Sequence, residues 1–146
     1  HLERECADTD GVLPAPGAPE LVAWLNERSL PWGVVTNAHL RLARARLGAA
    51  GIEAPVIVSF DDVERGKPHP DGYLLGVRRL GVEPRRVAGV EDSAPGLEAA
   101  RAAGTLVVAV GGTREAGAEC DVACDDLHEL RRLLASAGPR PSSRLP

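Results

Sequence analysis

Short apolar runs alternate along this chain with stretches in which apolar residues recur at helical spacing. The predicted strands cover residues 32–36, 55–59, 87–90 and 105–110, with a short edge strand over 121–124. The predicted helices cover about 19–28, 40–50, 71–80, 95–103 and 127–134. Strands that alternate with helices form βαβ units, in which the strands run parallel and helices cover both faces. The sequence therefore predicts an α/β fold built on a Rossmann-like parallel sheet.

The composition is that of one soluble, globular domain, because 44% of the 146 residues are hydrophobic and 26% are charged. We expect this core domain to cover residues 1–134, and the Ser-, Pro- and Arg-rich residues 135–146 to form a disordered tail. The net charge of −4 argues against non-specific binding of nucleic acid, and no apolar run is long enough to cross a membrane. Three cysteines, an odd number, favour reduced thiols in a cytoplasmic protein.

One lysine, Lys67, stands among 17 basic residues that are otherwise all arginine. It lies between Gly66 and Pro68, in a loop between the second strand and the third helix of the predicted order. Glycine allows a close approach of the backbone, and proline fixes its own φ angle, so such a loop can hold a side chain in one place. Because lysine is a compact positive charge and a common phosphate ligand, the loop indicates a phosphate-binding site.

Polar residues follow two of the predicted strands at the point where each strand ends. Thr36 and Asn37 come after the first strand, and Glu91 and Asp92 come after the third. The carboxyl ends of parallel strands meet at one edge of a sheet, where ligands bind, and we expect Lys67 at that edge as well. Two adjacent carboxylates repel each other unless a cation neutralises them, and hard oxygen ligands suit Mg²⁺. Together these groups could hold and neutralise a phosphoryl group.

Each of these residues also has a purely structural interpretation. Lys67 could be a chance lysine in a surface turn, and Thr36 could cap the helix that follows its strand. Asp92 or Ser93 could instead cap the helix that begins near Pro95. The predicted convergence of the groups at one edge of the sheet is what favours a functional site.

Three segments, in this order and at this spacing, resemble the second, third and fourth motifs of the haloacid dehalogenase superfamily. They are Val34-Val35-Thr36-Asn37, Gly66-Lys67-Pro68 and Val90-Glu91-Asp92-Ser93. The neighbouring segments resemble the sugar-phosphatase and β-phosphoglucomutase-like branch of this superfamily. These are Pro31-Trp32, Val63-Glu64-Arg65-Gly66-Lys67-Pro68 and Asp71-Gly72-Tyr73-Leu74-Leu75-Gly76. The resemblance covers about residues 8–125.

The resemblance implies a Mg²⁺-dependent phosphatase that hydrolyses a small, sugar-like phosphate monoester through an aspartyl-phosphate. It implies that Thr36 and Lys67 are catalytic and that both bind the phosphoryl group, with Asn37 beside them. It further implies that Asp92, helped by Glu91, is the metal ligand.

The first motif of the family is an Asp-x-Asp that supplies the nucleophile and the general acid/base. Asp8-Thr9-Asp10 has the residue types of this motif, but the segment before it does not fit. The polar segment Leu2–Ala7 cannot be the buried strand that this motif requires. We therefore interpret Asp8 and Asp10 as incidental acids at the exit from a cap domain, and the chain as the C-terminal core portion of a longer phosphatase. In the family the first strand lies between the strands that precede Thr36 and Glu91, so its absence would leave open strand edges and a gap in the core.

Two other functions remain open from the sequence. A phosphomutase of the same family would use the same residues and differ in the cap, which also selects the substrate. A non-catalytic module would bind phosphate or a partner chain without turnover. An upstream reading frame with a hydrophobic strand ending in Asp-x-Asp would favour the enzyme, whereas a start codon near His1 would favour the module. The sequence leaves the oligomeric state open.

Overall fold

The computed structural model describes residues 14–112 and 119–137. Asp8, Asp10 and most of the predicted tail therefore lie outside the described residues. The helices are α2 (Ala18–Glu27), α3 (Leu40–Ala49), α4 (Asp71–Leu80), α5 (Ala94–Ala102) and α6 (Leu127–Ser136), with short 3-10 turns η1 (Phe60–Asp62) and η2 (Pro84–Arg86). The strands are β1 (Val34–Val35), β2 (Ile57–Val58), β3 (Ala88–Glu91), β4 (Leu106–Val110) and β5 (Val122–Cys124). Every predicted strand and helix is present, in the predicted order.

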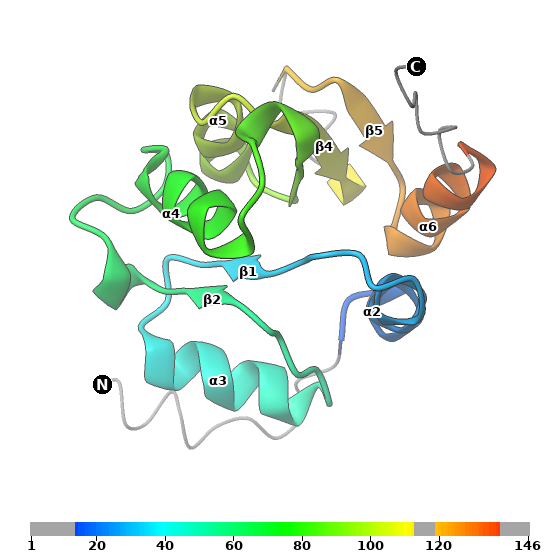
Figure 1. Cartoon of the computed structure of the whole chain (residues 1–146), viewed down its shortest axis with the longest axis horizontal. Coiled ribbons are helices and arrows are strands. Elements are labelled where there is room, and N and C mark those ends of the chain that lie inside the picture. The colour runs from blue at the N-terminus through cyan, green and yellow to red at the C-terminus, as the bar shows by residue number, and fades with distance from the viewer. Residues whose placement is uncertain (1–13, 113–118, 138–146) are drawn as a thin grey trace, which may run out of the picture.

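The strands form two parallel sheets rather than one continuous sheet (Figure 1). In the first sheet β1 pairs with β2, and Val34 lies opposite Ile57. In the second sheet the order is β3-β4-β5, with β5 at the edge as predicted. Within the described residues, β1 and β3 each have a hydrogen-bonded strand on one side only. The open strand edges that the sequence predicted therefore lie on β1 and β3.

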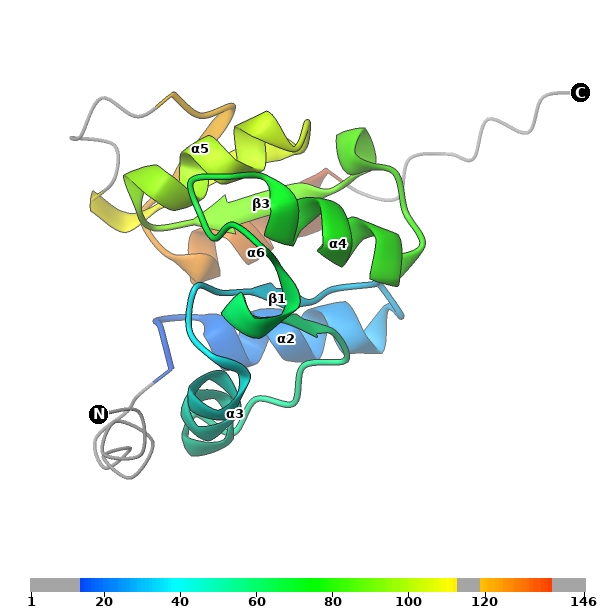
Figure 2. The ribbon, with the colours of Figure 1, turned by 90° about the vertical axis from the view of Figure 1, so that its left-hand side faces the viewer.

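Helices cover both faces of the β3-β4-β5 sheet, as the alternation of side chains along β4 shows. Val107 and Ala109 point into a core cluster with Leu97 and Ala100 of α5 and with Tyr73 of α4. Val108, which lies between them, points to the opposite face, into a cluster with residues of α6 and α2. Successive residues of a strand point to opposite faces, so α4 and α5 cover one face while α2 and α6 cover the other (Figures 1 and 2).

Helix α4 lies close to the β1-β2 sheet because it presents glycines to it. A β-carbon on Gly72 would lie 2.7 Å from Cγ1 of Val35, and one on Gly76 would lie 3.3 Å from Cγ2 of the same valine. The helix begins at Asp71, which is favourable at the positive end of a helix, and ends at Gly81 with a φ of 70°. These bounds match the predicted helix 71–80, and they fix the position of the Lys67 loop, which leads directly into α4.

Helix α6 runs beyond its predicted end. Asp126 caps its first turn by accepting a hydrogen bond from the backbone N–H of Glu129 at 2.9 Å, and the helix continues to Ser136 rather than to Leu134. Residues 135–136 therefore belong to the helix and not to the predicted tail. In the described parts of the chain, none of the helices combines the length and the apolar character needed to cross a bilayer.

Candidate active site

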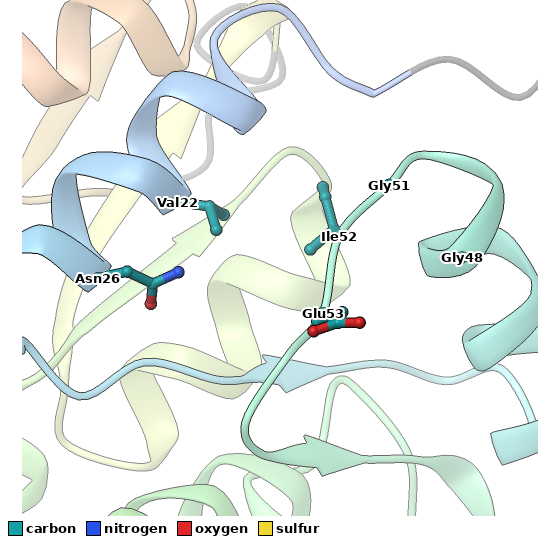
Figure 3. Close-up of a pocket in the computed structure, with 6 residues that line it drawn as sticks. All are labelled: Val22, Asn26, Gly48, Gly51, Ile52 and Glu53. Atoms are coloured by element: carbon teal, nitrogen blue, oxygen red, sulfur yellow. The ribbon is translucent and has the colours of Figure 1, made fainter.

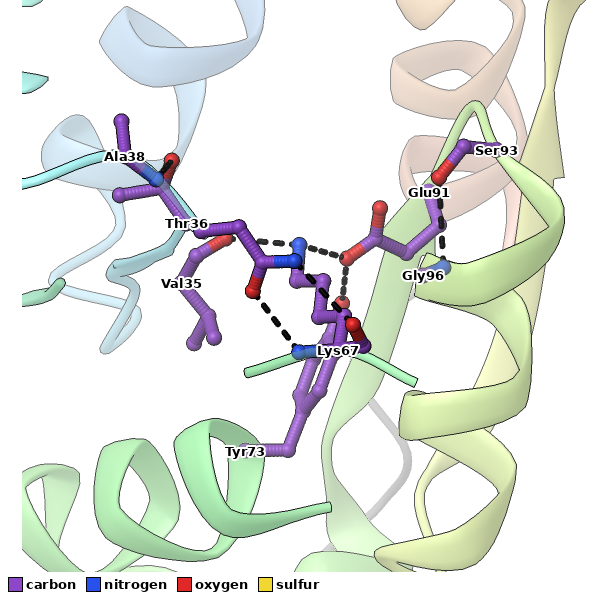
Figure 4. Close-up of polar contacts among 9 residues, drawn as sticks. Val35, Thr36, Ala38, Lys67, Tyr73, Glu91, Ser93 and Gly96 are labelled. Carbon is purple, nitrogen blue, oxygen red and sulfur yellow. Dashed lines mark hydrogen bonds and ion pairs between the residues drawn. The ribbon is translucent and has the colours of Figure 1, made fainter. Parts of the chain in front are cut away.

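The Lys67 ammonium group lies between the carboxyl end of β1 and the carboxyl end of β3 (Figure 4). Its Nζ donates to the backbone carbonyl of Val35 at 2.8 Å and to Oε1 of Glu91 at 2.5 Å. The two side chains of the pair are largely buried, with 14% of Lys67 and 8% of Glu91 exposed. The structure thus brings Lys67 to the edge where the sequence placed it, bound to Val35, which precedes Thr36, and to Glu91, which precedes Asp92.

The backbone of Lys67 is held by the side chain of Asn37. The Lys67 N–H donates to Oδ1 of Asn37 at 2.8 Å, and Nδ2 of Asn37 donates to the Lys67 carbonyl at 3.2 Å. A β-carbon on Gly66 would lie 2.6 Å from that Oδ1, so the close approach depends on glycine at this position. Both polar atoms of this carboxamide hold the lysine loop in place, and Nδ2 has a second hydrogen to donate, so phosphate binding by Asn37 stays a prediction.

Thr36 is half-buried at the end of β1, where its Oγ1 accepts a hydrogen bond from the Ala38 N–H at 3.0 Å (Figure 4). This bond closes a turn before α3, whose N-cap is His39, so Thr36 does not cap that helix as its purely structural interpretation required. A hydroxyl that accepts a hydrogen bond still has its own hydrogen to donate. Thr36 can therefore support the turn and also donate to an anion at the edge of the sheet.

Glu91 and Asp92 do not form a pair of facing carboxylates. Glu91 is buried at the end of β3, whereas Asp92 is exposed. The two acids therefore lie in different environments, one against the core and one at the surface. The cation that neutralises Glu91 in this structure is the ammonium of Lys67.

Tyr73, on the first turn of α4, is part of the same cluster. Its hydroxyl donates to Oε1 of Glu91 at 2.5 Å, the oxygen that also receives Lys67. Burial, together with the negative charge of Glu91, raises the pKa of Tyr73 above its ordinary value, so it stays a hydrogen-bond donor. The sequence analysis named Tyr73 only within the segment Asp71–Gly76, in the predicted helix 71–80, and gave it no part in the site. The signal that could have found it is that it is the only tyrosine in the chain.

Helix α5 begins directly after the acidic pair. Ser93 is its cap, because its Oγ accepts a hydrogen bond from the Gly96 N–H at 3.2 Å (Figure 4). Of the two capping residues that the sequence left open, Ser93 has this role. Asp92 is thereby left exposed at the edge of the sheet, between the end of β3 and the start of α5.

The described residues do not complete a magnesium site. They contain no group of three or more His, Cys, Asp or Glu side chains that could hold a metal ion. Asp92 is exposed and could supply one oxygen, while Oε1 of Glu91 is occupied by Lys67 and Tyr73. Mg²⁺ demands six ligands in octahedral geometry, so Asp92 alone does not account for its binding.

A hollow of about 400 Å³ lies on another part of the molecule (Figure 3). It is lined by Val22 and Asn26 of α2 and by Gly48, Gly51, Ile52 and Glu53 around the end of α3. None of these residues belongs to the predicted site. They come from segments that lead into β1 and β2, whereas the Lys67 cluster lies where the strands end.

Three known proteins show what this chain resembles. Hexitol phosphatase A of Escherichia coli (strain K12) is 38% identical over 138 residues, which is 92% of this chain and 62% of that protein. The structure of CbbY from Rhodobacter sphaeroides in complex with Xylulose-(1,5)bisphosphate is 31% identical, with a TM-score of 0.80, and the match covers 88% of this chain and 62% of that one. A HAD family hydrolase from Deinococcus radiodurans R1 with bound phosphate and sodium is 28% identical, with a TM-score of 0.75, over 84% of this chain and 59% of that one.

This chain spans about three fifths of the length of each of the three proteins. The family model for haloacid dehalogenase-like hydrolases matches residues 1–104, which include the Thr36, Lys67 and Glu91-Asp92 segments. The chain therefore belongs to the haloacid dehalogenase-like hydrolases.

Proposed function

We propose that the whole protein hydrolyses phosphate monoesters of small sugars or sugar alcohols through an aspartyl-phosphate intermediate. The observation that carries this proposal is the position of the Lys67 ammonium. It is held between the Val35 carbonyl, at the end of β1, and the Glu91 carboxylate, at the end of β3. A fixed, largely buried positive charge at the carboxyl edge of parallel strands suits the stabilisation of a phosphoryl group during transfer.

Each site residue has a distinct part in the proposed reaction. Lys67 offsets the repulsion between the phosphoryl oxygens and an attacking aspartate, and Thr36 donates its hydroxyl hydrogen to a phosphoryl oxygen. Asn37 keeps the Lys67 backbone in register with the end of β1. Asp92 is the proposed ligand of Mg²⁺, an ion that would supply further positive charge, and the help expected from Glu91 stays a prediction.

The proposed substrate class rests on two of the similar proteins. One is a phosphatase named for hexitols, and the other holds a pentulose bisphosphate in its structure. Hexitol phosphates and pentulose bisphosphates are both polyhydroxylated carbon chains that carry phosphate esters. A phosphorylated sugar or sugar alcohol is therefore the substrate class to test first.

The test is phosphate release by the product of the complete reading frame that encodes this sequence. It would be incubated with Mg²⁺ and a panel of phosphorylated sugars and sugar alcohols, with Lys67→Ala as the control for contaminating phosphatase. We expect release that depends on Lys67 and that is abolished by a chelator of divalent cations. Isomerised sugar phosphate without phosphate release would indicate a mutase instead. Saturable phosphate binding without turnover would indicate the non-catalytic module.

A further inference from the structure

We propose that Tyr73 is a positioning residue: its hydroxyl fixes the Glu91 carboxylate and thereby holds Lys67 between the two strand edges. The importance of this inference for catalysis rests on the proposed function. The contacts among Tyr73, Glu91 and Lys67 do not depend on that function. Tyr73 belongs to none of the motifs from which the site was predicted.

Tyr73 contacts both members of the ion pair. Its hydroxyl donates to Oε1 of Glu91 at 2.5 Å, and the Lys67 Nζ lies 5.7 Å from the centre of its ring. The hydroxyl and the ammonium thus bind the same carboxylate oxygen from two directions. Two donors on one oxygen define where that oxygen lies far better than a single flexible lysine does.

The tyrosine ring is itself firmly held. Tyr73 is 8% exposed and packs in the core cluster with Leu97 and Ala100 of α5. On β3, a β-carbon on Gly89 would lie 3.1 Å from Cε1 of the ring, so the strand backbone lies directly against it. A ring confined by a helix and a strand can tilt little, because protein cores are close-packed. Because the core holds the ring in place, the Tyr73 hydroxyl can hold the Glu91 carboxylate in one position.

The lysine depends on this carboxylate because its stem is flexible. Asn37 fixes only the backbone of Lys67, several rotatable bonds away from Nζ. The described partners of Nζ are the Val35 carbonyl on one strand edge and Glu91 on the other. If Glu91 loses the Tyr73 hydroxyl, its carboxylate can rotate, and the ammonium is then anchored mainly at β1. The expected result is a more mobile and more accessible Lys67.

The test uses the 146-residue chain and needs no turnover. Tyr73→Phe removes the hydroxyl and keeps the ring. Thr105→Val is the matched control, since the Thr105 hydroxyl is also buried and also donates one hydrogen bond, to the Ala100 carbonyl at 2.9 Å. Because Lys67 is the only lysine, lysine labelled with ¹⁵N at Nζ gives a single side-chain amine signal in NMR spectra. Reductive methylation, read by mass spectrometry of the Lys67 peptide, reports how accessible the amine is.

We expect Tyr73→Phe to raise the methylation rate of Lys67 by on the order of tenfold, the equivalent of one hydrogen bond to a charged group. The Lys67 NMR signal should also move toward that of free lysine, while Thr105→Val should change neither readout. An unchanged signal and rate in a folded Tyr73→Phe chain would overturn the inference. Equal changes in both variants would overturn it as well, because they would reflect general loosening of the core. Phosphatase assays play no part in these readouts, so the proposed function and this inference can fail separately.

Discussion

Gly96, in the first turn of α5, lies against the carboxylate of Glu91 with no room for a side chain between them. A β-carbon on Gly96 would overlap Oε2 and Cδ of Glu91 and would lie 2.9 Å from its Cγ. The carboxylate is therefore confined by α5 on one side, while Lys67 and Tyr73 bind it on the other.

We predict that Gly96→Ala destabilises the chain, although alanine favours helices over glycine. The added methyl group must displace Glu91, and forcing extra volume into a packed site costs about 1–3 kcal/mol. Urea denaturation followed by circular dichroism would measure the change in the free energy of unfolding. Gly48→Ala is the control, because Gly48 is also helical and its β-carbon would meet no atom within 4 Å. It should stabilise the chain by about 0.5–1 kcal/mol. The same sign for both variants would contradict the packing described for Gly96.

A second prediction concerns the buried ion pair. Lys67→Met leaves the Glu91 carboxylate without its cation, which should cost about 3 kcal/mol of the free energy of unfolding. Adding Glu91→Gln should recover part of that loss, because the uncompensated charge is gone while the amide can still accept from Tyr73. Denaturation of the two single variants and the double variant gives the coupling energy directly. A coupling energy near zero would mean that the pair is too well solvated to contribute.

The third prediction concerns catalysis by the product of the complete reading frame. Lys67→Ala should lower its phosphatase rate by on the order of 10²–10³, the loss that follows removal of one charge-stabilising donor. Lys67→Arg should recover little of that rate. The space for Nζ is bounded by the Val35 carbonyl, Glu91 and the Tyr73 ring, and a planar guanidinium would not fit the same two acceptors. Steady-state kinetics would decide: a folded Lys67→Arg enzyme near full activity would show that positive charge alone suffices.

The fourth prediction concerns acid stability. Asp62 accepts hydrogen bonds from the backbone N–H and the hydroxyl of Ser59, and these bonds, chiefly the backbone one, hold the pKa of Asp62 below its ordinary value. A depressed pKa in the folded state stabilises the fold above the unfolded-state pKa, and this contribution disappears as the pH falls through the folded-state pKa. Asp62→Asn should therefore be less stable than the parent chain near neutral pH, and the difference should shrink below about pH 4. Denaturation of both chains across this pH range measures the difference in their free energies of unfolding. A difference that does not vary with pH would contradict the lowered pKa of Asp62.

The sequence predicted the order of the elements and the edge at which the site lies, because both follow from local patterns. Gly81 ends α4 where helical spacing stops, and Lys67 stands out because it is the only lysine and lies between Gly66 and Pro68. Contacts between distant segments were not predictable in this way. The bonds of Asn37 to the Lys67 backbone span 30 residues, and the Tyr73–Glu91 bond spans 18. Nothing in a single sequence distinguishes a phosphate-binding amide from one that holds a loop.

The acidic pair shows the same limit. From the sequence, Glu91 and Asp92 were adjacent carboxylates that needed a cation, with Asp92 as the metal ligand and Glu91 as its helper. In the structure Glu91 is buried and Asp92 is exposed, and Glu91 receives its cation from the protein itself. Which of two adjacent acids points inward depends on the register of β3 against β4, where Glu91 lies opposite Ala109. That register is set by tertiary packing.

The separation of the two sheets has a consequence for the local unfolding of the molecule. Residues 34–80 contain the whole β1-β2 sheet with α3 and α4, and residues 88–136 contain the whole β3-β4-β5 sheet with α5 and α6. Each half is continuous in sequence, so its strands find each other over short loops and with a small entropic cost of closure. Among the described residues, no strand pairing joins the halves, so either sheet can open without breaking the ladder of the other. Amide hydrogen exchange in the native state should therefore show that the strand amides of the β1-β2 sheet and those of the β3-β4-β5 sheet open with different free energies.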